Sequence, residues 1–157
     1  MRSSICSITV CCMLLLVCGC RVSPPSSLER RTIVAVKHHI TVGGRSERNP
    51  LVFNSDNVAA GKEAFGHYCV ACHGIDGQNT GVPFADRISP PLPSLASREV
   101  QDYTDGQLKW IIDNGLSPSG MPASSGILSD DEIWSIIVFL RHLPPAGSLG
   151  EPEMYSH

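Results

Sequence analysis

The sequence has few cysteines once its first twenty residues are set aside. Five of the seven cysteines lie in that short stretch, and the other two are Cys69 and Cys72. A mature protein cut near residue 20 therefore has no further pair for a structural disulfide. Other scarcities also exclude functions. There is no apolar run long enough to span a bilayer comfortably, and a formal net charge of −3 gives no reason to expect nucleic-acid binding.

The longest apolar run, from Ile5 to Val17, follows the single basic residue Arg2. This length is too short for a membrane span but suits the core of a signal peptide. The run ends in Val17-Cys18-Gly19-Cys20, which resembles a bacterial lipobox, the motif whose final cysteine is lipidated. We therefore expect residues 1–20 to be a signal peptide, with Cys20 as the lipidated first mature residue. Plain secretion and an uncleaved anchor are the alternatives, and all three give a periplasmic or otherwise extracytoplasmic protein.

Composition and charge divide the rest of the chain. Residues 21–56 begin with a polar, proline-rich stretch and hold six basic and three acidic side chains, so we expect a tether and an irregular N-terminal arm. Within it, residues 32–42 are rich in Ile, Val and Thr, which predicts one strand. Residues 57–144 are expected to form one domain and residues 145–157 a C-terminal tail. Residues 57–157 hold five basic and twelve acidic side chains.

The two later cysteines belong to Cys69-Val70-Ala71-Cys72-His73, the C-x-x-C-H pattern for covalent attachment of one c-type haem. Thiols three residues apart lie on one face of a helical turn, so both can form thioethers to one porphyrin. His73 would then be the proximal iron ligand. The alternatives are a chance match, a thioredoxin-like dithiol and half of a zinc site. A zinc site needs two more ligands at matched spacing, and none follows.

The segment Gly120-Met121-Pro122 supplies the candidate for the opposite iron ligand. A lone Met between Gly and Pro in a polar loop makes little sense as core, but it suits a thioether that points at the iron. The competitors are weak, because Met154 lies in the tail and His142 would require the last helix to enter the distal pocket. The sequence thus predicts His73 and Met121 as the haem-iron ligands, a pair that raises the reduction potential.

The proline-rich segment Ser89-Pro90-Pro91-Leu92-Pro93 is expected to lie beside this site. Proline has no N–H, so the segment presents bare carbonyls along a rigid path. The carbonyl of Pro90 is the candidate acceptor for the Nδ1–H of His73, and Leu92 is expected against the haem face. A plain proline loop is the alternative.

Three helices are expected in the domain. Asn57 is a plausible N-cap for a helix that runs from about Val58 into the haem motif. Thr104 and Gln107 fit a capping box, as do Ser129 and Glu132, each before an apolar helical pattern. Gly115 is expected just past the end of the second helix, and Pro144 and Pro145 after the third.

From Asn57 to Leu143 the chain resembles the class I monohaem cytochromes c. The resemblance is carried by the C-x-x-C-H run, the Met121 loop, the capped last helix, and Gly61 and Phe65 one turn apart. It implies an all-α cytochrome c fold in which the N- and C-terminal helices cross beside a covalent haem, with Gly61 and Phe65 facing three apolar residues of the last helix. These are Ile136, Phe139 and Leu140. The arm at 21–56 departs from the basic family domain.

These features predict a single-electron carrier that cycles between Fe(II) and Fe(III) and is not an enzyme, because both axial positions are filled. Its partners would be a dehydrogenase or oxidase with a basic docking face, and the membrane through the lipid anchor. The alternative is a five-coordinate haem that binds a small gas or reduces peroxide. The least specific alternative is a lipoprotein domain that binds no haem.

Overall fold

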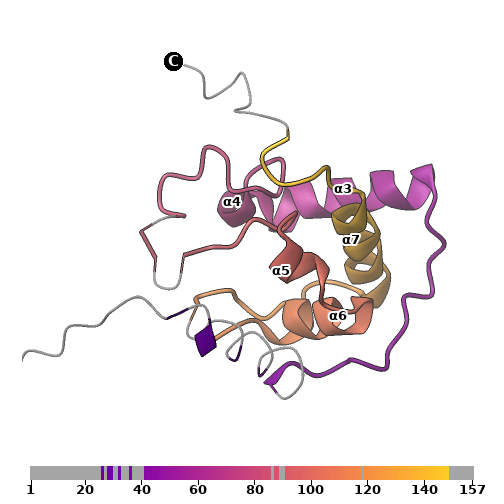
Figure 1. Ribbon diagram of the computed structural model, residues 1–157. Helices are drawn as coiled ribbons and strands as arrows, with labels where there is room; N and C mark the ends of the chain where they lie inside the picture. The colour runs from indigo at the N-terminus through magenta and orange to yellow at the C-terminus, as the bar shows by residue number, and fades with distance from the viewer. Residues whose placement is uncertain are drawn as a thin grey trace, which may run out of the picture. The chain divides into compact units, whose positions relative to one another are not determined.

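Figure 1 shows the computed structural model, which describes residues 41–148 except 86, 89, 90 and 118, together with five earlier residues. These five are Ser26, Leu28, Glu29, Thr32 and Val36. The chain divides into the units Met1–Ile33 and Val34–His157. In the first, the Ser26 N–H donates to the Glu29 carboxylate at 2.7 Å. Apart from Thr32, the structure described below lies in the second unit.

The described part of the second unit is helical and contains no named strand, which confirms the all-α fold class. Its elements are α3 (Ser55–Tyr68), α4 (Val70–His73), α5 (Arg98–Gln101), α6 (Asp105–Asn114) and α7 (Asp130–His142). The strand expected over 32–42 is wrong at its described residues, because Thr32 and Val36 are helical and Thr41 lies in a π turn. β-Branched composition is only a weak preference that context overrides. None of the helices among the described residues is long and apolar enough to cross a membrane.

Helix α3 begins one turn earlier than expected. Its N-cap is Asn54, whose side chain accepts from the Asn57 N–H at 2.8 Å. Asn57 lies inside the first turn, and its own side-chain amide reaches back to the carbonyl of Val52 at 2.7 Å. The expected cap at Asn57 is therefore wrong. Residues 54–57 are all polar residues that can cap a helix, and the hydrogen bonds show that the first of them is the N-cap.

Helices α3 and α7 cross and form the centre of the domain (Figure 1). Gly61 makes the crossing close, since a Cβ at this position would lie 1.9 Å from the carbonyl oxygen of Ser135. One turn later, the rings of Phe65 and Phe139 pack with centroids 5.2 Å apart. Ile136 and Leu140 are buried in the same core. The helix crossing expected from the resemblance is confirmed.

Both predicted capping boxes are present. Thr104 and Gln107 start α6, and Ser129 and Glu132 start α7, each with the reciprocal pair of side-chain to main-chain bonds. Gly115, at φ +69°, ends α6 as expected. Between them, Lys109 of α6 pairs with Asp113 at 2.7 Å and with Asp130 of α7 at 3.0 Å. The pair between Lys109 and Asp130 joins the two helices that flank the loop carrying Met121.

Arg141 ties the end of α7 to the segment between α5 and α6. Its guanidinium donates to the Asp105 carboxylate at 2.9 Å, to the carbonyl of Gln101 at 2.8 Å and to the carbonyl of Tyr103. The side chain is 23% exposed. Sequence reasoning missed this residue, because its partners lie far from it in the chain.

Replacing Arg141 with methionine is expected to cost about 2 kcal/mol of stability, because two main-chain carbonyls and a carboxylate lose a charged donor while the aliphatic packing is kept. Arg98→Ala is the control, since that side chain is 94% exposed and pairs with Asp102 only at 3.8 Å. It is expected to cost less than about 0.5 kcal/mol. Denaturant unfolding measures both, and equal effects of the two substitutions would contradict this role of Arg141.

The segment that precedes α3 is packed on the domain. Val42 is buried in the core, and the main chains of Gly44 and Gly106 touch, so that a Cβ at Gly106 would lie 2.0 Å from the Gly44 oxygen. The side-chain amide of Asn49 donates to the carbonyl of Trp134 at 3.0 Å. Residues 42–49 thus lie against α6 and α7.

Candidate functional site

One turn of chain presents both cysteine thiols and the histidine. Cys69 is the junction of α3 and α4. Its N–H donates to the carbonyl of Phe65, and its own carbonyl accepts from the N–H of Cys72 at 3.1 Å and from the N–H of His73 at 2.9 Å. The helical hydrogen bonds of α3 therefore continue into the C-x-x-C-H run. This continuity places Cys69 and Cys72 on one face, as the spacing predicts.

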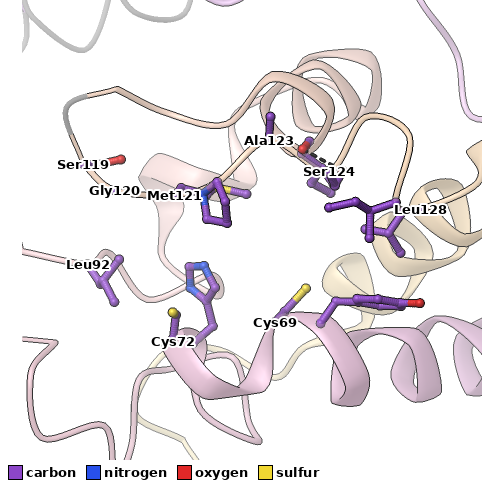
Figure 2. A pocket seen from close by; sticks show the side chains of 14 residues that line it. Cys69, Cys72, Leu92, Ser119, Gly120, Met121, Ala123, Ser124 and Leu128 are labelled. Atoms are coloured by element: carbon purple, nitrogen blue, oxygen red, sulfur yellow. Dashed lines mark hydrogen bonds between the residues drawn. The ribbon is translucent and has the colours of Figure 1, made fainter.

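The described residues enclose an apolar pocket of about 210 Å³ at this turn. It brings together Cys69, Cys72, His73, Leu92 and Met121, which are all of the expected haem-site residues within the described chain. In Figure 2 the side chains of Cys69 and Cys72 point from the helix toward the pocket, and Met121 lies across from them. Pro90 and Cys20 lie outside the described residues.

Further lining residues come from two regions. Tyr68 and Ile112 extend from α3 and α6, and the rest belong to the loop after α6. These loop residues are Ser119, Gly120, Pro122, Ala123, Ser124, Ile127 and Leu128. Tyr68, Ile112 and Ile127 were not expected from the sequence, which contains no local signal that they meet.

The loop that carries Met121 is pinned to α6. The Leu116 N–H donates to the Met121 carbonyl at 3.0 Å, and the Ser124 N–H and hydroxyl both donate to the Ile112 carbonyl. Gly115 allows this fold: a Cβ there would lie 2.4 Å from the Met121 oxygen, and its φ is positive. The backbone also turns at Gly120, with φ at +81°. Met121 is thus held at the pocket by its main chain.

Burial affects the titratable groups of the site. Burial, and to a lesser degree the neighbouring Cys72, raises the pKa of Cys69 to about 11. A reactive dithiol needs the opposite shift, because the thiolate is the nucleophile, so a thioredoxin-like dithiol is disfavoured. Burial also lowers the pKa of His73, which keeps the imidazole neutral and able to bind a metal.

A zinc site and a histidine as distal ligand are disfavoured as well. Within the described residues, no group of three or more His, Cys, Asp or Glu side chains is placed to hold a metal ion, so nothing completes a zinc site. His142, the rival for the distal position, does not line the pocket. Its ring lies 5.8 Å from that of Phe53.

The model of the family described as cytochrome c oxidase, cbb3-type, subunit III matches residues 56–140, more than half of the chain. The chain belongs to this family. The match runs from α3 to α7 and includes every residue that lines the pocket. No curated protein matches the chain. The segment 42–49 lies outside the matched residues, as does the rest of the arm before residue 56.

Membership in this c-type cytochrome family establishes the coarse function. The domain binds haem and is an electron carrier rather than an enzyme, and the expected cytochrome c class and fold are confirmed. The residues of the pocket fit the group. An imidazole and a thioether face one apolar cavity beside two thiols.

Proposed function

We propose that the domain carries single electrons on one haem, attached covalently through Cys69 and Cys72 and ligated by His73 and Met121. One observation carries this proposal. Two thiols and an imidazole from one helical turn share an apolar pocket with a thioether from a loop far along the chain. When bound, the haem supplies the Fe(II)/Fe(III) couple, and a His/Met ligand pair raises its potential.

The residues of the chain then have separate tasks. Cys69 and Cys72 would hold the group on the α3–α4 turn, and His73 would bind the iron with a neutral imidazole. Met121 would be the second protein ligand of the iron and would leave no coordination site for a gas or peroxide. The apolar walls from Leu92, Ile112 and Leu128 limit the entry of water. Low access of water favours the less charged reduced form and so supports a high potential.

The family and the charges and motifs of the sequence also support a location and a class of partner. We propose that the domain works outside the cytoplasmic membrane, held there by a lipid on Cys20, and exchanges electrons with a dehydrogenase or oxidase. The cbb3-type oxidase in the family's description supports an oxidase complex. The excess of acidic side chains in residues 57–157 supports a basic docking face on the partner.

The double replacement of Cys69 and Cys72 by alanine is expected to abolish stable holoprotein. Roughly ninety residues can build only a modest apolar core, so the haem itself should complete it. Each single replacement is expected to leave little holoprotein. A pyridine haemochrome assay on isolated membranes measures covalent haem, and the wild type should show one haem for each chain.

The matched control changes the same run but keeps both thiols. Ala71→Ser alters an exposed position between the two cysteines and is expected to leave covalent haem unchanged. A normal yield of folded, haem-bearing protein from the double variant would refute attachment at these thiols.

A further inference from the structure

The segment from His73 to Asn79 contains several buried polar side-chain atoms. Three side-chain nitrogen or oxygen atoms of the described residues are buried without a hydrogen-bond partner, and all three lie between residues 73 and 79. They are His73 Nδ1, Gln78 Nε2 and Asn79 Oδ1. In such a poorly solvated place the bonds that are made count for more than they would at the surface.

Asn79 makes two bonds that join separate parts of the site. Its main-chain N–H donates to the carbonyl oxygen of His73 at 2.9 Å. Its side-chain Nδ2 donates to the carbonyl oxygen of Leu92 at 2.8 Å. His73 and Leu92 both line the pocket, and in the sequence the long loop from Gly74 lies between them. Asn79 is therefore a direct link between the histidine and the apolar wall.

The backbone at Asn79 is arranged for this link. Asn79 has φ +63° and is the one non-glycine residue with positive φ among the described residues. This conformation costs most side chains energy, and asparagine tolerates it better than most. The Asp76 carboxylate holds the approach to this turn by accepting from the Gln78 N–H at 2.9 Å and from the Thr80 hydroxyl at 2.7 Å.

We propose that Asn79 is a positioning residue for the haem site: it fixes the main chain of His73 relative to Leu92 and so holds the ligand imidazole in one orientation. The proposal rests on the proposed function, because it concerns the ligand His73. It adds a residue that touches neither the iron nor the pocket. Asn79 acts through the two carbonyl groups to which it donates.

Asn79→Gly tests the side chain alone, since glycine accepts a positive φ without strain. The variant is expected to incorporate haem fully, by the pyridine haemochrome assay. Its reduction potential is expected to fall, because water that replaces the side-chain amide at the Leu92 carbonyl, on the pocket wall, favours the charged ferric form. Its ferric low-spin EPR signal is expected to broaden, since the imidazole then samples several orientations.

Asn49→Ala is the matched control. Asn49 also donates its side-chain amide to a distant main-chain carbonyl, that of Trp134 at 3.0 Å, but neither residue lines the pocket. This control is expected to lower the melting temperature while leaving the potential and the EPR line width at wild-type values. Equal changes of potential in Asn79→Gly and Asn49→Ala would mean general loosening and would overturn the proposal.

Two further outcomes are decisive. If Asn79→Gly binds haem and keeps the wild-type potential and line width, the positioning role is wrong, whatever its melting temperature.

Should Asn79→Gly give too little protein, Asn79→Asp carries the EPR test, because a carboxylate replaces the Nδ2 donor at a residue type that tolerates positive φ. A wild-type protein without haem would overturn the proposed function itself, a result that the haemochrome assay separates from the others.

Discussion

Met121→Leu is expected to convert the electron carrier into a haem protein with an open coordination site. The leucine side chain has a similar volume, so packing in the pocket is largely kept while the thioether sulfur is lost. Without the soft, neutral ligand the iron no longer favours Fe(II), and the reduction potential should fall by a sizeable part of the ~0.8 V span that axial ligands control. The weak far-red methionine–iron absorption band should disappear.

Carbon monoxide provides the second measurement on Met121→Leu. The reduced variant should bind carbon monoxide rapidly, whereas the reduced wild type should bind it slowly because Met121 must first leave. Met154→Leu, the same substitution in the tail, is the control and should match the wild type in potential, spectrum and ligand binding. A wild-type protein that lacks the far-red band and binds carbon monoxide at once would instead favour a five-coordinate haem.

Gly61→Ala is expected to destabilise the domain strongly, although it adds only one methyl group. The new Cβ would stand 1.9 Å from the Ser135 oxygen, a main-chain atom that cannot turn aside. Helices α3 and α7 would have to separate, which should cost about 3 kcal/mol, a large share of the ~5–15 kcal/mol that stabilises a typical domain. For a domain of this size we expect the melting temperature to drop by about 12–24 °C.

Gly66→Ala is the matched control for Gly61→Ala. Gly66 lies in the same helix, and a Cβ there would meet nothing within 4 Å. Alanine is the better helix former, so the control should gain about 0.5–1 kcal/mol. Thermal unfolding of the haem-loaded proteins compares the two. An unfolding free energy of Gly61→Ala within about 1 kcal/mol of the wild type would show that α3 and α7 can separate at little cost, and would contradict the prediction.

Patterns confined to a few residues predicted much of the fold. The capping boxes at Thr104 and Ser129 occur as expected because each needs only two residues three positions apart. Met121 stood out because a methionine between glycine and proline has no reason to be core. The choice of Asn54 over Asn57 as N-cap was missed, since both are good caps and the bond from the Asn57 N–H to the Asn54 side chain, which decides between them, is seen only in the structure.

Contacts between distant residues set the limit of prediction. Arg141 lies in the last turn of a helix, and nothing near it in the sequence indicates its partners, which lie about 40 residues earlier in the chain. Asn79 is one of several polar residues in a glycine-rich loop. Its role depends on the contact with Leu92, which only the structure shows. The assigned roles of Cys69, Cys72, His73 and Met121 stay predictions for the experiments above.

The α3–α7 crossing has a consequence for the order in which the protein is made. Its two helices stand near opposite ends of the domain, so the last helix must be synthesised before the crossing can close. Long-range contacts of this kind form late, because the chain between them must first be ordered. The thiols on the α3–α4 turn therefore emerge well before the core that buries Cys69. Under the proposed covalent attachment, this interval leaves both thiols accessible to haem before α7 closes the domain.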